Sequence, residues 1–174
     1  MMRPPMLAGI AGLCTVALLA SGTTAPASNN DIANARQATS QYHRIDTAKS
    51  AGYELLRDAK GISCIDHPPD GAMGIHYVKG SLVGDGAVNL TTPEALVYEP
   101  REGGRLHLVA IEYVVFQAAW DEKHAKPPSL YGRDFELVGA ENRYGLPAFY
   151  ELHVWLFKNN PTGTFYDWNP RVSC

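Results

Sequence analysis

The chain lacks the short motifs that identify most common enzyme classes. It contains no His-Glu-x-x-His, no Gly-x-Ser-x-Gly, no phosphate-binding loop, no dinucleotide fingerprint and no Cys-x-x-Cys. These absences remove the usual signatures of zinc proteases, serine hydrolases, nucleotide-dependent enzymes and dithiol redox proteins. They also leave no good candidate for a catalytic nucleophile.

A strong excess of charge of either sign is missing as well. The 174 residues include 15 Lys and Arg against 18 Asp and Glu, a formal net charge of −3. Nucleic-acid-binding domains and proteins that bind anionic membranes usually carry a basic patch or a basic tail. We therefore expect no nucleic-acid partner, and a small ligand or a metal ion is the expected class of partner.

Only one apolar run is long enough to suggest targeting, and it lies at the start of the chain. Residues 6–20 are apolar or small, Arg3 precedes them, and Ala25-Pro26-Ala27 follows as a small-x-small cleavage pattern. This arrangement predicts a signal peptide over residues 1–27, too short for a comfortable membrane span of roughly 20 residues. The expected product is one domain over residues 28–174, secreted or periplasmic, with no membrane span after removal of the leader.

Cysteine is scarce, with three in the whole chain. Cys14 falls within the predicted leader, so Cys64 and Cys174 are the two cysteines expected in the exported domain. In an oxidising compartment this pair predicts a disulfide that closes a loop of about 110 residues. The alternative, a thiolate pair that binds metal, would need further soft ligands nearby, and the sequence offers none.

Hydrophobic periodicity predicts an α+β fold, with short N-terminal helices packed on a curved, mainly antiparallel β-sheet. Helices are expected over residues 30–43 and from an N-cap at Asp46. Residues 61–71 are expected to form an irregular loop, and residues 159–174 a tail that wraps on the surface. Strands are expected over residues 72–78, 95–99, 106–116 and 150–157.

Three polar residues interrupt the apolar strands, and they are the candidate metal ligands: His76, Glu112 and His153. Two imidazoles and one carboxylate are a common ligand set for zinc or a redox metal such as copper. Alternation places His153 on a mostly aromatic face of its strand, where a buried polar group needs a partner. Glu112 and His153 meet only if their strands pair in one register, because a slip of one residue would bring Tyr113 or His107 to His153 instead.

Other interpretations of these residues stay open from the sequence. The histidines could be core or rim residues hydrogen-bonded to the backbone, with Glu112 paired to Arg105 or Arg133. A His/Glu pair could also act as acid and base on a small extracellular substrate. A third hypothesis is a binding module that uses aromatic side chains of the tail, Phe165, Tyr166 and Trp168, on a sugar or peptide.

Several short segments together resemble a group of uncharacterised exported bacterial proteins. The resemblance implies export and a single domain over almost the whole mature chain, and it implies no mechanism. The segments are Met73-Gly74-Ile75-His76-Tyr77, Val97-Tyr98-Glu99-Pro100, Glu112-Tyr113, Glu151-Leu152-His153-Val154-Trp155 and Asn169-Pro170-Arg171-Val172-Ser173-Cys174.

Overall fold

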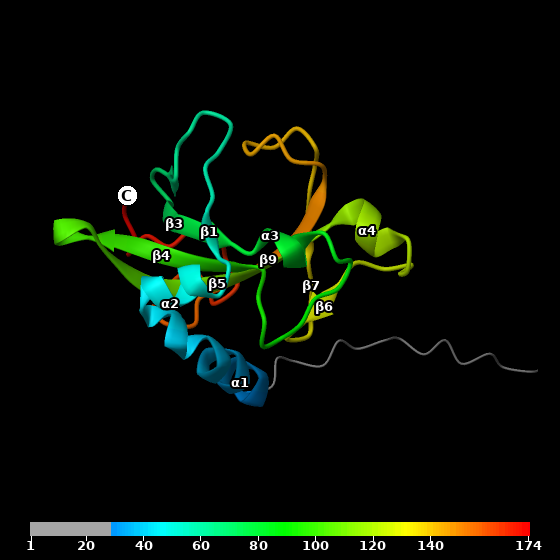
Figure 1. The fold of residues 1–174 in the computed structure, drawn as a ribbon, viewed down its shortest axis with the longest axis horizontal. Coiled ribbons are helices and arrows are strands. Elements are labelled where there is room, and N and C mark those ends of the chain that lie inside the picture. Colours follow the sequence, from blue (N-terminus) through cyan, green and yellow to red (C-terminus); the bar gives the residue numbers. More distant parts are fainter. Residues whose placement is uncertain (1–28) are drawn as a thin grey trace, which may run out of the picture.

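The computed structural model describes residues 29–174, so the leader predicted for residues 1–27 lies outside the described part of the chain (Figure 1). The helical elements are α1 (Asn29–Thr39), η1 (Ser40–His43), α2 (Ile45–Ser50), α3 (Gly80–Val83), η2 (Glu102–Gly104) and α4 (Gln117–Asp121). The strands are β1 (Glu54–Leu55), β2 (Cys64–His67), β3 (Gly71–Val78), β4 (Ala95–Arg101), β5 (Arg105–Phe116), β6 (Ser129–Leu130), β7 (Arg133–Asp134), β8 (Glu136–Val138) and β9 (Phe149–Val154).

Seven strands form one antiparallel sheet, in the order β1, β3, β4, β5, β9 and β8, and β2 also pairs with β3. Strands β6 and β7 form a separate two-stranded ribbon. The α+β prediction with a mainly antiparallel sheet is therefore confirmed. Within residues 29–174, no helix has the length and apolar character needed to cross a membrane.

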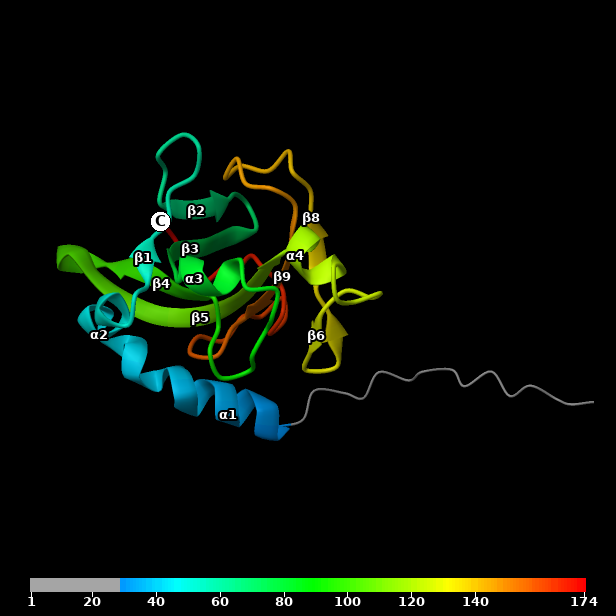
Figure 2. The same cartoon turned by 45° about the vertical axis from the view of Figure 1, so that its right-hand side comes forward.

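Helices α1 and α2 lie along one face of the curved sheet (Figures 1 and 2). The side of α1 and η1 that packs on the sheet carries Ala35 and Thr39, which are fully buried, and Tyr42, which is partly buried. The Tyr98 hydroxyl donates a hydrogen bond of 2.7 Å to the Tyr42 carbonyl and so ties this helical segment to β4. The N-terminal helices thus cover one face of the sheet.

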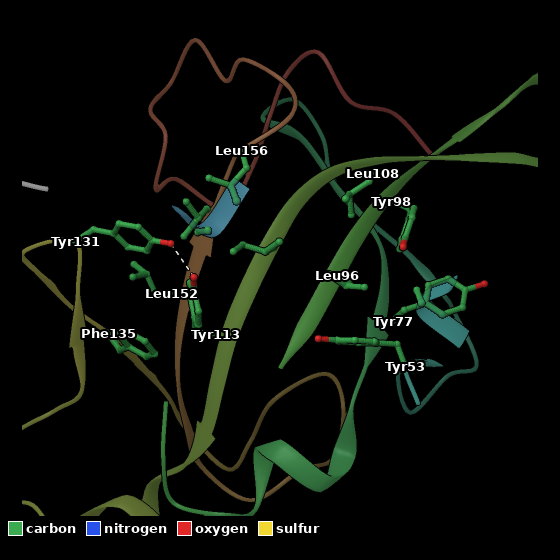
Figure 3. Close-up of a cluster of buried hydrophobic side chains, with 14 of the residues drawn as sticks. Tyr53, Tyr77, Leu96, Tyr98, Leu108, Tyr113, Tyr131, Phe135, Leu152 and Leu156 are labelled. Carbon is green, nitrogen blue, oxygen red and sulfur yellow. Dashed lines mark hydrogen bonds between the residues drawn. The ribbon is translucent and has the colours of Figure 1, made fainter. Parts of the chain in front are cut away.

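The core under the helices is rich in tyrosine, and Figure 3 shows its two ends. At one end the hydroxyls of Tyr113 and Tyr131 lie 2.7 Å apart and share a hydrogen bond. At the other end, Tyr77 and Tyr98 pack edge to face. Beyond the extra residue Val109, the odd-numbered residues of β5 supply this face together with the even-numbered residues of β9, so the opposite parity carries Glu112 and His153 to the other side.

Four local predictions need correction. Residues 64–67 form a strand on the edge of β3, where an irregular loop was expected; the glycines and prolines around it hid a local hairpin with residues 71–75. Strand β4 continues through Pro100 to Arg101 because a proline at that pairing position does not stop the strand. Strand β9 ends at Val154, and helix α2 begins at Ile45, so Asp46 lies in its first turn and is not the N-cap.

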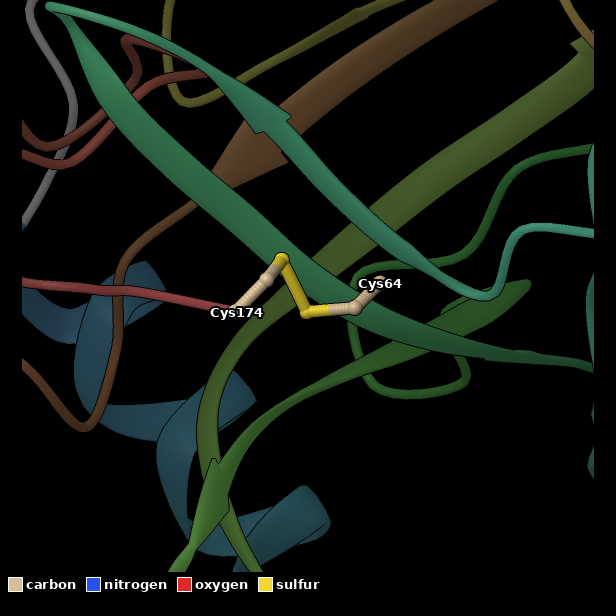
Figure 4. The surroundings of a disulfide bond; sticks show 2 residues. All are labelled: Cys64 and Cys174. Atoms are coloured by element: carbon tan, nitrogen blue, oxygen red, sulfur yellow. A yellow bond between two sulfur atoms is a disulfide. The ribbon is translucent and has the colours of Figure 1, made fainter.

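Cys64 and Cys174 are joined by a disulfide, as predicted, with their Cα atoms 5.7 Å apart (Figure 4). The bridge fixes the last residue of the tail to β2. Just before it, Asn169 pairs with Ala72 at the start of β3, and Val172 is buried. The C-terminal tail is therefore held against the sheet by a covalent bond, a short backbone pairing and an apolar anchor.

Candidate metal centre

His76, Glu112 and His153 come from three strands and converge on the sheet face opposite the helices. Glu112 of β5 is paired directly with His153 of β9, which is the register that the sequence required. On the other side of β5, Glu112 is paired with Ala95 of β4, and His76 of β3 is paired with Val97 of β4. The imidazole of His76 therefore reaches Glu112 across one intervening strand.

The strands around the cluster pack closely and contain a local irregularity. The register between β4 and β5 shifts between Val97 and Tyr98, so Val109 of β5 is the extra residue. Gly74 of β3, with a φ of 116°, lies against the Tyr98 carbonyl of β4. A Cβ atom on Gly74 would lie 2.6 Å from the Tyr98 carbonyl oxygen, so only glycine allows the two strands to approach this closely.

The three side chains lie close enough to share one ion. One ligand atom from each lies within 4.8 Å of the other two, and the Nε2 of His76 is 3.4 Å from a carboxylate oxygen of Glu112. Around a tetrahedral ion with bonds of 2.0 to 2.2 Å, neighbouring ligand atoms are about 3.4 Å apart. The pair from β3 and β5 already has this spacing, and a rotation of the His153 ring would bring the third ligand into range.

Both histidines are buried without hydrogen-bond partners. His76 and His153 are each 1% exposed, and neither ring nitrogen of either residue has a partner among residues 29–174. The contact between His76 and Glu112 lacks the geometry of a hydrogen bond. Buried polar atoms are nearly always paired in proteins, so four unpaired nitrogens in one place indicate a site that is completed by something else.

The arrangement argues against the structural roles considered from the sequence. Neither histidine makes a backbone hydrogen bond of acceptable geometry, although the Gly74 backbone lies near His76, and no arginine or lysine of the described residues forms an ion pair with Glu112. Arg105, one of the two partners considered, lies exposed at the far end of β5. The other, Arg133, stacks over the Phe165 ring at 4.8 Å.

Burial keeps both imidazoles neutral. It lowers the pKa of His76 to about 4, with a smaller contribution from the charge of Arg143, and the nearby Gly74 backbone opposes the shift only in part. Burial also lowers the pKa of His153, and the neighbouring His76 adds to the effect. Neutral imidazole is the form that binds a metal ion, so no proton has to leave either ring at neutral pH.

The carboxyl group of Glu112 has a second carboxyl group beside it. Burial raises the pKa of Glu112 well above its usual range, and the charge of Glu151 raises it further. Protonated Glu112 donates a hydrogen bond to Glu151, whose own pKa is raised to about 7 by burial and by Asp167. Two adjacent carboxyl groups that hold a proton can exchange it for a cation.

Two hollows border the cluster. One, of about 140 Å³, is mainly acidic, and it is lined by Arg133, Asp134, Glu136, Glu151, Leu152, His153, Phe165 and Asp167. The other, of about 50 Å³, is mainly apolar, and it is formed by Leu56, Val78, Val83, Glu112, Val114, Tyr144, Leu146, Phe149 and Glu151. The segment 139–148 that closes the apolar hollow is fixed by Arg143, whose guanidinium lies 2.9 Å from the Asp58 carboxylate.

The sequence named the three central residues but missed part of their surroundings. The acidic residues around them were not among the predicted ligands, and Glu136 and Asp167 reach the site only through the folding of a short edge strand and of the tail. Of the three tail aromatics, Phe165 packs on Tyr131 and Trp168 stacks on His67, at ring-centre distances of 5.5 and 5.0 Å. Tyr166 is the most exposed, at 44%.

The chain matches no model of a known protein family, no curated protein and no solved structure. The resemblance to exported bacterial proteins therefore stays a prediction. The argument for a function depends on the geometry of this face of the sheet.

Proposed function

We propose that this protein is an exported domain that binds a divalent transition-metal ion, zinc or copper, through His76, Glu112 and His153. The observation that carries the proposal is the set of four unpaired imidazole nitrogens in the buried cluster. Each buried and unsatisfied polar group costs roughly 1 to 3 kcal/mol. A metal ion would satisfy one nitrogen of each ring with the bond that imidazole makes best.

Charge balance supports a divalent ion. The two histidines are neutral, while Glu112 and Glu151 can together supply two negative charges when their protons leave. A doubly charged cation at the cluster would therefore be neutralised locally.

The ligand types favour zinc or copper over magnesium or calcium. Imidazole nitrogen suits borderline cations, whereas magnesium and calcium prefer sites made wholly of oxygen. Three protein ligands leave one position of a tetrahedral ion open, as in catalytic zinc sites. The disulfide between Cys64 and Cys174 supports export, because such bonds persist in oxidising compartments.

Calorimetric titration of protein prepared without a histidine tag tests the proposal. We expect the wild type to bind one equivalent of zinc or copper. His153→Ala should remove an inner ligand and weaken binding by at least tenfold, and Glu112→Gln should weaken it while preserving the shape of the site. His43→Ala is the control, because that side chain is exposed at the end of η1.

Metal analysis of the same four proteins after purification gives an independent measure. Protein that carries no metal and binds neither zinc nor copper above background would end the proposal. Equal binding by wild type, His153→Ala and Glu112→Gln would place the metal elsewhere on the chain.

A second candidate function is acid and base catalysis on a small substrate without metal. The observation in its favour is Glu151, whose pKa of about 7 is suited to proton transfer and which lines both hollows. The two functions differ in what Glu112→Gln does to binding. Metal binding requires the carboxylate as a ligand, whereas a metal-free acid/base site predicts no change in metal content.

A further inference from the structure

We infer that the acidic hollow beside His153 is where the metal cation is captured and from which it passes to the buried cluster, an inference that rests on the proposed function. Asp134, Glu136, Glu151 and Asp167 bring four carboxyl groups to the wall of this hollow of about 140 Å³. Those four groups form no ion pair with any lysine or arginine among residues 29–174. Their negative charge is therefore available to an incoming cation.

A second observation connects this hollow to a ligand. The ring of His153 forms part of the wall, is 1% exposed, and has no hydrogen-bond partner on either nitrogen among the described residues. A hydrated cation could lose its water molecules in steps here, because carboxylate oxygens of the hollow and then the unpaired imidazole would replace them. Glu151 completes the connection, because its carboxyl group lies in the hollow and is hydrogen-bonded to Glu112.

The other approaches to the cluster are less suitable for a hydrated ion. The apolar hollow is smaller, about 50 Å³, and walls such as Val83, Leu146 and Phe149 offer no oxygen to replace lost water. Below the cluster lies the sheet itself, and the opposite face is covered by helices. Trp155 covers His153 on the remaining side, at 4.7 Å between ring centres.

Arg133 provides a test of opposite sign. It lies beside the hollow, with its guanidinium held over the Phe165 ring at 4.8 Å. A positive charge there opposes the approach of a cation, so its removal should speed capture, whereas removal of a carboxylate should slow it. A general loss of structure could produce only one of these two effects.

Stopped-flow mixing with copper measures the step directly, since copper quenches tryptophan and Trp155 lies against His153. We expect Asp167→Asn and Glu136→Gln to slow association at least threefold at low ionic strength, and Arg133→Gln to accelerate it. The differences should shrink as salt is added, because salt screens charge at distances beyond about 10 Å. Trp155→Phe identifies the reporter, and zinc followed with a chelating dye repeats the experiment without quenching.

Glu102→Gln is the matched control, because it removes an exposed carboxylate from the distant β4–β5 turn and should leave the rate unchanged. Association rates of the Asp167 and Glu136 variants equal to that of this control would overturn the capture route and leave metal binding intact. Wild-type protein that binds neither metal would overturn the capture route and the proposed function together. Unfolding curves for each variant verify that the fold is retained.

Discussion

Replacement of His76 by leucine should stabilise the metal-free protein and at the same time abolish metal binding. His76 is buried with both ring nitrogens unpaired, and leucine has a similar volume without polar atoms. Removal of buried groups that lack partners returns roughly 1 to 3 kcal/mol. For a domain of about 150 residues this corresponds to a rise in melting temperature of roughly 3 to 10 °C.

The loss of His76 should not create a new unsatisfied group. Glu112 keeps its hydrogen bond to Glu151 when the imidazole is absent. Arg143 repels His76 only when that ring is protonated, so the substitution removes no favourable contact of Arg143. His153→Leu is a second variant of the same kind at the other end of the cluster. His107→Leu, at an exposed position of β5, should change stability by no more than about 0.5 kcal/mol.

Chemical and thermal unfolding with a chelator present, and again with zinc, provide the assay. With zinc at a hundred times its dissociation constant, wild type should gain about 2.7 kcal/mol, whereas His76→Leu should gain nothing. The difference in unfolding free energy between the two proteins should therefore narrow or change sign when metal is added. If both leucine variants lower the unfolding free energy of metal-free protein by more than about 1 kcal/mol, the histidines are structural and the reasoning fails.

Three further predictions concern the fold around the site. Cys174→Ser opens a loop of 110 residues and should lower the free energy of unfolding by about 4 to 5 kcal/mol, measured as a large fall in melting temperature. Free thiols at Cys64 and Cys174 in the exported protein would contradict the disulfide. Burial raises the pKa of Glu94 to about 8, so its neutral form stabilises the fold fully below about pH 4.5, and this is lost as pH rises toward 8. Glu94→Gln should therefore flatten the pH dependence of unfolding by up to about 1.4 kcal/mol per unit. Gly74→Ala, which strains a φ of 116°, should cost about 2 kcal/mol in denaturant unfolding.

Strand parity made the central residues of the site predictable. Side chains alternate along any strand, so the face on which a polar residue lies can be assigned without knowing the register. That rule was enough to single out Glu112 and His153. It could not show that they are paired, because register depends on contacts between segments about 40 residues apart, and it could not place His76, which reaches them across β4.

The rest of the site depends on features that leave little local signal. The register shift at Val97 and Tyr98 arises from the pairing of β4 with β5, and Gly74 is required by the approach of the Tyr98 carbonyl when β3 pairs with β4. Asp167 belongs to a tail with no regular secondary structure, and its position is set by the disulfide at Cys174 and the pairing of Asn169. Residues 64–67 were missed for a different reason, since their strand comes from a local hairpin with β3 that glycine and proline disguise in the sequence.

The two faces of the sheet contribute differently to the folding free energy, which explains how the protein tolerates a cluster of buried polar groups. The helix-covered face buries most of the tyrosine-rich and aliphatic core and supplies the bulk of the folding free energy. The opposite face can then hold His76 and His153 in a low-dielectric environment without hydrogen-bond partners, beside the Glu112 and Glu151 pair. Since His76, Glu112 and His153 all lie on inner strands, their backbone positions are fixed before any ion arrives. A site built in this way loses stability when metal-free and gains affinity from ligands that need little rearrangement, which is the balance expected of a domain whose purpose is to hold a cation.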